Sequence, residues 1–127
     1  MKQIMLAICG CMMAMMPVHA QTMADVLRTM PDSVLPLLTR NDRLDLVDEW
    51  QGGVKAEVKN RLGGMVRLTD LSDSKASMEL SSVSSVTFEI VEHPDRHKKA
   101  VRMVHTCTTD GLTNRYERWF TLDWRSE

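Results

Sequence analysis

Cysteine is scarce in this sequence of 127 residues, which contains only three. Cys9 and Cys11 lie in the first twenty residues, and only Cys107 lies in the remainder. A domain with one cysteine cannot form an internal disulfide, even in an oxidising compartment where disulfides are common. Paired-cysteine metal motifs, a Walker phosphate loop and a Rossmann glycine fingerprint are absent as well. The sequence therefore excludes a disulfide-stabilised scaffold and provides no motif for a nucleotide, a cofactor or a metal ion.

The sequence also lacks an excess of charge of either sign. Sixteen Lys and Arg residues against 17 Asp and Glu residues give a formal net charge of -1. Nucleic-acid-binding domains normally carry a strongly basic surface, so this balance argues against a nucleic-acid partner. No internal repeat, low-complexity tract or linker divides the chain. We therefore expect residues 21–127 to form a single domain with a modest core.

Residues 1–20 have the features of a secretory signal peptide. Lys2 supplies a positive charge, Ile4–Met16 is an apolar run, and Val18–Ala20 is a cleavage site of the small-residue type. The apolar run is shorter than the roughly 20 residues that a membrane-spanning helix needs. We therefore expect no transmembrane span once the leader is removed.

Cleavage is expected between Ala20 and Gln21, which predicts a periplasmic or secreted mature protein. Removal of the leader changes the net charge from -1 to -2, because Lys2 is its only charged residue. A lipid anchor on Cys11 is the alternative. It is less favoured because the apolar run continues past Cys11, where a lipid-anchored chain normally turns polar.

The run Met30–Gly53 is the most densely patterned part of the chain after the leader, and it predicts two short helices. With Ser33 as N-cap, Pro36 falls in the first turn of a helix, where its missing N–H costs nothing. A further amphipathic helical turn is expected just before this run, over Thr22–Met30. We expect this turn to pack beside the Ser33–Trp50 unit.

The second predicted helix begins at Thr39 or Asn41, and Thr39 with Asp42 has the spacing of a capping box. Gly52 and Gly53 are expected to end it, because glycine adopts the left-handed conformation without steric cost. One apolar stripe should bury this helix, and its members are Leu44, Leu46, Val47 and Trp50. The charged residues between them, Arg43 included, are expected to face solvent.

After this helix the hydrophobic period changes to two, which is typical of half-buried strands. Turn residues separate about six such segments at hairpin spacing, which favours an antiparallel meander. The strands are expected near Val54–Val58, Met65–Leu71, Ser77–Leu80, Val86–Ile90, Val101–Cys107 and Tyr116–Trp124, with a polar loop at His93–Lys99. The predicted fold class is therefore α+β: short N-terminal helices packed on an antiparallel β-meander of about six strands.

Aromatic residues gather in the last predicted strand and form the candidate ligand or partner surface: Tyr116, Trp119, Phe120 and Trp124. Exposed aromatic side chains often mark contact surfaces. An open edge strand carrying them would be prone to pairing with another chain. Either a partner covers this edge, for example in a homodimer, or the domain continues in a C-terminal portion that this sequence lacks.

Several runs resemble DUF3256, a family of unknown function from Bacteroidales-type bacteria. The runs are Met30–Ser33, Leu35-Pro36, Leu38-Thr39, Asn41, Arg43–Asp48, Asn60-x-x-Gly63, Val104–Thr106 and Tyr116-x-x-Trp119. The resemblance covers nearly all of the mature chain. It implies an exported protein, usually longer than this one, and it carries no activity and no catalytic residue.

Two groups of residues could in principle ligate a metal ion. Asp42, Asp45 and Glu49 share a helical face, but calcium requires six or more oxygen ligands, and no calcium-binding loop motif is present. His93 and His97 have helical spacing, but Pro94 opposes a helix between them, and the neighbouring lysines and arginine repel a cation. A solvated charged face and a polar loop are the simpler interpretations, and no metal is expected.

His105 and Cys107 are predicted to share one face of a strand, where a Cys–His nucleophile pair is conceivable. Residues two apart on a strand are poorly aimed at each other, so a buried apolar cysteine is the simpler interpretation. Ser33 lacks the glycines of a nucleophile elbow. We therefore expect an exported, non-catalytic interaction or ligand-binding module whose partner is a protein or small ligand of the cell envelope. The alternative is a hydrolase or metal-dependent enzyme of the envelope.

Overall fold

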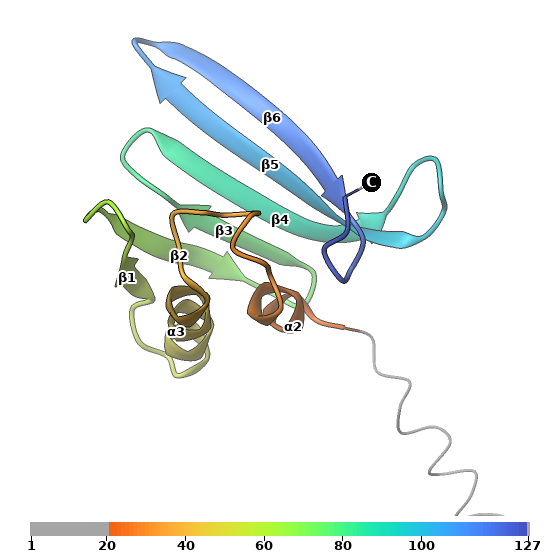
Figure 1. Ribbon diagram of the computed structural model, residues 1–127, viewed down its shortest axis with the longest axis horizontal. Coiled ribbons are helices and arrows are strands. Elements are labelled where there is room, and N and C mark those ends of the chain that lie inside the picture. Colours follow the sequence, from red (N-terminus) through yellow and green to blue (C-terminus); the bar gives the residue numbers. More distant parts are fainter. Residues whose placement is uncertain (1–20, 127) are drawn as a thin grey trace, which may run out of the picture.

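The structure, a computed structural model, describes residues 21–126, so the predicted leader and the lipidation site Cys11 lie outside the described part. Two helices precede six strands along the chain (Figure 1). The helices are α2 (Met23–Arg28) and α3 (Arg40–Gln51). The strands are β1 (Glu57–Lys59), β2 (Met65–Leu71), β3 (Lys75–Glu79), β4 (Ser84–Glu92), β5 (Lys99–Thr109) and β6 (Leu112–Phe120).

Both helices begin with a complete capping box. The Thr22 side chain accepts a hydrogen bond from the N–H of Asp25 at the start of α2, and Thr39 and Asp42 form the same arrangement in α3. Each box satisfies backbone donors that the first turn of a helix leaves free. Gly52 caps the end of α3, and Gly53 follows with φ +75°. The predicted start and end of α3 are confirmed.

The predicted helix beginning at Ser33 is wrong. Residues 31–37 form a series of turns instead, and we call this stretch the turn segment. The proline at position 36 disfavours a helical conformation at Leu35, and the backbone of this segment bonds to a side chain of α3. Arg43 donates to the carbonyl oxygens of Leu38 at 2.9 Å and Met30 at 2.6 Å, at the two ends of the segment.

The buried stripe of α3 differs from its prediction at one position, where Arg43 replaces Leu44. Arg43, Leu46 and Val47 are buried, whereas Leu44 is only half-buried. Trp50 is also half-buried and packs against the core. The expectation that Arg43 faces solvent is therefore wrong, and the reason is its bonds to the turn segment.

The six strands form one sheet in the order β1-β2-β3-β4-β5-β6, and every neighbouring pair is antiparallel. A two-residue turn joins β5 to β6, with Asp110 and Gly111 at φ 53° and 78°. Positive φ at both positions suits the twist of a hairpin and explains the Asp-Gly pair. The predicted meander and the α+β class are confirmed, although β1 starts at Glu57 and leaves Val54 exposed.

The helices cover only part of the sheet. Helix α3 packs on β1 and β2, and α2 contacts α3 and β4. The hairpin β5–β6 extends away from both helices (Figure 1), and the β6 residues from Leu112 to Arg118 are all exposed. The core lies between the helices and the sheet, with Phe88 and Met78 among its fully buried side chains, and it extends to Val101 of β5 and Phe120 at the end of β6.

The last strand ends earlier than predicted. β6 stops at Phe120, and residues 121–125 turn the chain back so that Ser126 bridges Phe120 in antiparallel fashion. Trp124 therefore does not share a strand face with Tyr116. Its indole N–H donates to the carbonyl of Val26 in α2 at 2.8 Å, and its ring lies edge-on to Phe88 with centroids 6.0 Å apart.

Candidate ligand-binding cleft

A cleft of about 330 Å³ lies where the turn segment between the helices passes over the exposed hairpin. The turn segment contributes one wall, strands β5 and β6 contribute the other, and Leu80 lies at the end of β3. The lining residues are Val34, Leu35, Pro36, Leu37, Leu80, Met103, His105, Tyr116 and Arg118. Most of them are apolar, and the three polar side chains all come from β5 and β6. We call this the hairpin cleft.

The sheet register brings the polar residues of the hairpin cleft together. His105 pairs with Tyr116 across β5 and β6, and Met103 pairs with Arg118. Side chains directly opposite on an antiparallel pair share a face and lie about 5 Å apart. His105 is half-buried, whereas Tyr116 is 61% exposed. The cleft therefore combines an apolar interior with a polar rim.

Arg118 is the charged group of the hairpin cleft. Its guanidinium lies over the ring of Phe120, 4.7 Å from the ring centroid, and this cation–π contact orients it. Within the described residues no carboxylate forms an ion pair with Arg118. A guanidinium of this kind retains its donors for an anionic group such as a carboxylate.

His105 bonds to Ser84 rather than to Cys107. The Ser84 Oγ and His105 Nε2 atoms lie 2.7 Å apart, while the Cys107 Sγ contacts the Thr109 hydroxyl at 4.0 Å. One of the two imidazole nitrogens, Nε2, is thus bonded to a serine. Within the described residues no hydrogen bond joins His105 to Cys107, which a Cys–His nucleophile pair requires.

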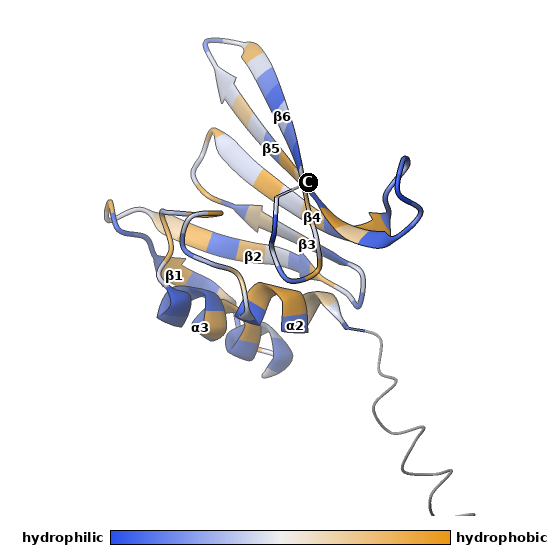
Figure 2. Cartoon of the chain, turned by 45° about the vertical axis from the view of Figure 1, so that its right-hand side comes forward, coloured by the Kyte–Doolittle hydropathy of each residue, from blue (hydrophilic) through white to orange (hydrophobic). Residues whose placement is uncertain are grey.

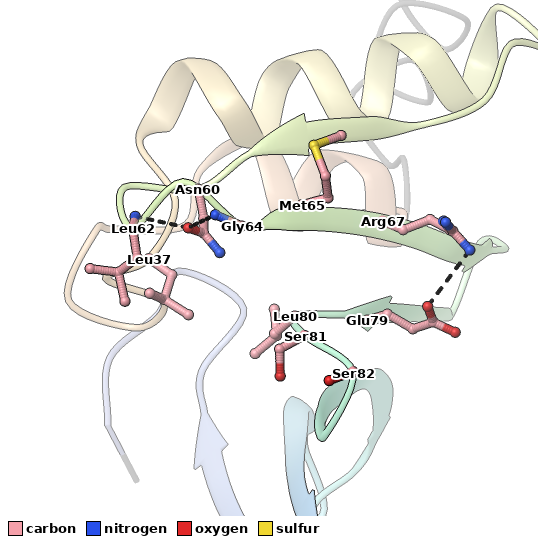
Figure 3. A pocket seen from close by; sticks show the side chains of 10 residues that line it. All are labelled: Leu37, Asn60, Leu62, Gly64, Met65, Arg67, Glu79, Leu80, Ser81 and Ser82. Atoms are coloured by element: carbon pink, nitrogen blue, oxygen red, sulfur yellow. Dashed lines mark hydrogen bonds and ion pairs between the residues drawn. The ribbon is translucent and has the colours of Figure 1, made fainter.

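A second, more open cleft adjoins the first and shares Leu37 and Leu80 with it (Figure 3). Several of its polar side chains are bonded to one another or to the backbone. The Asn60 side-chain oxygen Oδ1 accepts from the N–H groups of Leu62 and Gly64 at 2.8 and 3.0 Å. Arg67 pairs with Glu79 at 3.8 Å and with Glu57 at 2.9 Å. This cleft is the larger of the two, and its arginine forms ion pairs, whereas Arg118 forms none within the described residues.

The four aromatic residues predicted as one surface do not form one. Phe120 and Trp124 are 2% and 7% exposed and belong to the core, so the expectation that they are exposed is wrong. Trp119 lies on the opposite face of β6 from Tyr116, because neighbouring residues of a strand alternate. It packs against the His93 ring with centroids 4.7 Å apart. A ligand or partner contact at Tyr116 or Trp119 stays a prediction.

The residues weighed as metal ligands are dispersed in the described part of the chain, where no group of three His, Cys, Asp or Glu side chains could hold a metal ion. The Asp42 carboxylate accepts from the N–H of Thr39 in the capping box. His97 contacts Glu92 at 3.2 Å in the hydrophilic loop between β4 and β5, which is prominent at the right of Figure 2.

Two polar residues at or beside the hairpin cleft, Ser84 and Arg118, were not predicted from the sequence. A usable signal existed for Ser84, which shares the inward face of β4 with Val86 and Phe88. A polar residue at an inward position suggests a specific bonding partner, and here that partner is His105. Arg118 carried no such signal, because the strand predicted there was expected to be exposed.

None of the helices in residues 21–126 is long and apolar enough to cross a membrane. No curated protein matches the chain. A solved structure described as a domain of an uncharacterized protein from Porphyromonas gingivalis W83 is similar, with a TM-score of 0.70 and 22% sequence identity. The match covers 86% of this chain and 55% of the solved chain, so the sequence spans about half of that chain's length. At this identity the likeness concerns the fold alone.

The family model described as "Protein of unknown function (DUF3256)" matches residues 15–126, which is nearly the whole chain. The resemblance drawn from the sequence is thereby confirmed. This chain belongs to the DUF3256 family.

Proposed function

We propose that this chain is an exported, non-catalytic module that binds a small apolar ligand with one anionic group, or an apolar side chain beside a carboxylate, in the hairpin cleft. The observation that carries the proposal is the Arg118 guanidinium on the rim of an otherwise apolar cleft. Ligand sites of proteins commonly combine apolar walls with a few convergent polar groups. The Tyr116 hydroxyl and the His105 ring supply further polar contacts on the same side.

The size of the hairpin cleft limits the ligand. About 330 Å³ is at the lower end of the range for small-molecule sites. It accommodates a short alkyl or single-ring group, or one or two side chains of a partner. The turn segment supports this role because Arg43 holds both of its ends, at Met30 and Leu38. The wall formed by Leu35 and Pro36 is thus positioned before any ligand arrives.

Octanoate and 1-octanol are suitable probes, because they differ only in the anionic group. Ligand-observed NMR titration should give octanoate a dissociation constant roughly tenfold lower than that of 1-octanol, as expected for one charge-assisted hydrogen bond. The Arg118→Gln variant should remove this difference. Arg67→Gln, which neutralises an arginine in the adjoining cleft, is the matched control and should retain it.

Two outcomes contradict this proposal. Equal affinities for the two probes in the unaltered protein would remove the anionic group from the ligand description. If the Arg67→Gln and Arg118→Gln variants lose the preference for octanoate over 1-octanol to the same extent, general surface charge, and not the hairpin cleft, attracts the carboxylate.

The contact between Ser84 and His105 favours a second candidate function, a serine hydrolase. A distance of 2.7 Å meets the requirement for a nucleophile and its base. An oriented base normally also has a third group bonded to its other ring nitrogen, and among the described residues no carboxylate bonds to His105. A fluorophosphonate reagent separates the candidates: adduct formation at Ser84 supports the hydrolase, whereas the binding module predicts none.

Export is supported by the leader features of residues 1–20. Intact-mass measurement on the protein from its native host is the test. The proposal predicts a mass that starts at Gln21. A mass that retains Met1, or one that carries a diacylglycerol group on Cys11, would contradict it.

A further inference from the structure

The two clefts are parts of one longer hollow. Leu37 and Leu80 line both of them, so the clefts meet along these two side chains (Figure 3). The Leu37 carbonyl accepts a hydrogen bond from the N–H of Arg61 at 3.0 Å, which joins the turn segment to the β1–β2 turn at this point. The combined hollow has Arg118 at one end and Leu62 at the other. A ligand in the hairpin cleft therefore has space to continue beyond it.

The sheet order gives the length that a ligand needs to reach the junction. Arg118 lies on β6 and Leu80 follows β3, and these strands are three positions apart in the sheet. Their backbones are consequently separated by about 14 Å across the sheet. An extended chain advances roughly 1.2 Å per bond, so the chain of octanoate spans roughly 8 Å. Octanoate bound at Arg118 thus ends at or before the junction, and only a longer chain enters the adjoining cleft.

The path through the two clefts is bent. Met103 in the hairpin cleft points toward the helices and is buried. Met65 and Arg67 in the adjoining cleft alternate along β2 with the buried Val66 and Leu68, so they face the other side of the sheet. A ligand that occupies both clefts must therefore pass round the end of the sheet. A flexible alkyl chain can follow this path, whereas a rigid ring system cannot.

The charges determine which end of the ligand lies in which cleft. Arg67 is paired with Glu57 and Glu79, so a carboxylate in the adjoining cleft would compete with two carboxylates of the protein. The apolar side chains of this cleft are open to solvent, with Leu62 83% and Met65 48% exposed. Covering such side chains with an alkyl chain is favourable. The polar end of the ligand accordingly belongs at Arg118 and the apolar end in the adjoining cleft.

We infer that the ligand is an unbranched alkyl carboxylate of about 12 to 16 carbons, with its carboxylate on Arg118 and its tail passing between Leu37 and Leu80 to cover Leu62 and Met65. The inference rests on the proposed function for the position of the carboxylate and adds the length and course of the tail. The hairpin cleft alone accounts for a short ligand, so the two statements can be tested separately.

A chain-length series tests the course of the tail. Isothermal titration calorimetry should compare octanoate with dodecanoate, each below its micelle concentration. Dodecanoate should bind on the order of 100-fold more tightly, because four further methylene groups leave water. Amide signals of Leu62 and Met65 should shift with dodecanoate and stay in place with octanoate. If dodecanoate binds no more tightly than octanoate, the inference fails while the proposed function stands. If neither carboxylate binds, both fail.

A carboxylate placed at the end of the path tests where the tail lies. Leu62→Asp should weaken the binding of dodecanoate at least tenfold and leave octanoate binding unchanged, because only the longer chain reaches this position. Leu112→Asp is the matched control, since Leu112 is 72% exposed and lines neither cleft. It should change neither affinity. Equal dodecanoate affinities of the two variants would place the tail elsewhere and overturn the inference. Circular dichroism verifies that both variants are folded.

Discussion

The guanidinium of Arg43 lies inside the protein, where it is 2% exposed. It donates to the carbonyls of Met30 and Leu38 and to the exposed carboxylate of Asp32 at 2.8 Å. Its role is to close the turn segment over the sheet, since the two single-turn bonds from Val34 to Pro31 and from Leu38 to Leu35 do not tie that segment to α3. A single side chain thus determines the shape of one wall of the hairpin cleft.

Replacement of Arg43 by methionine should lower the free energy of unfolding by about 2–4 kcal/mol. The variant leaves two backbone carbonyls without their donors. Hydrogen bonds from a charged donor contribute more to stability than those between neutral groups, so their loss is costly. Asp32→Asn should change the free energy of unfolding by less than about 1 kcal/mol, because that carboxylate is largely exposed and solvent screens its ion pair with Arg43. Urea unfolding of the two variants is the measurement, and an equal loss in both would argue that the ion pair matters more than the carbonyl bonds.

Glu117 connects β6 to its neighbour through side chains. The hydrogen bond from Arg102, together with one from the Trp119 indole, lowers the pKa of Glu117 from its ordinary value of 4.5. A lowered carboxyl pKa in the folded protein adds stability that is fully present above the ordinary value. This stability is lost as the pH falls through the folded pKa. The midpoint temperature of the unaltered protein should therefore decline on acidification below about pH 4.5 more steeply than that of Glu117→Gln. If the midpoint temperatures of the two proteins fall in parallel as the pH is lowered, Glu117 does not contribute to the acid sensitivity of the fold.

At the scale of elements, the C-terminal turn secures the open end of the sheet to the helices. Trp124 reaches from residues 121–125 to α2, bonds to Val26 and packs on the rings of Phe88 and Phe120. Its backbone has a φ of 68°, which is rare for a large residue. The burial of the indole evidently compensates for this conformation.

Trp124→Ala should destabilise the protein by about 3–5 kcal/mol, the usual cost of deleting a buried large aromatic side chain. Trp124→Phe keeps a ring in the core and loses mainly the bond to Val26, so it should cost about 1–2 kcal/mol. Thermal unfolding of both variants measures the difference. If Trp124→Ala unfolds at the temperature of the unaltered protein, the turn is not an anchor.

At the same scale, structural features that depend only on neighbouring residues could be predicted from the sequence, whereas features that depend on packing between segments could not. The capping box at Thr39 and the hairpin turn at Asp110–Gly111 depend only on neighbouring residues, and both were predictable. The burial of Arg43 and Trp124 depends on segments that are distant in the chain, so periodicity misplaced both. The residue spacing placed Arg43 on the solvent side of its helix and Trp124 in a strand.

The candidate site was harder to predict than the fold for the same reason. Tyr116 was singled out as a surface aromatic, and His105 was expected to share a strand face with Cys107. Their proximity to Leu35 and Arg118 arises only when the turn segment closes over the hairpin. Sequence patterning indicates which face a residue takes, whereas a cleft between two non-adjacent segments requires the packing itself.

For the whole molecule, the asymmetry of the sheet is the feature that matters most. The helices cover the β1–β4 region, and Val101 and Met103 of β5 also belong to the core. The β6 residues from Leu112 to Arg118 are exposed, and two of them, Tyr116 and Arg118, line the hairpin cleft. The similar chain from Porphyromonas gingivalis W83 is longer, with 55% of its length covered.

A chemical-shift map with octanoate tests the central proposal most directly, because it locates the ligand without any substitution. Amide signals of isotope-labelled protein should shift at Leu35, Met103, His105, Tyr116 and Arg118 as octanoate is added, and signals of Leu62 and Met65 in the adjoining cleft should stay in place. Shifts confined to Leu62 and Met65, or the absence of any saturable shift, would contradict the assignment of the hairpin cleft as the binding site.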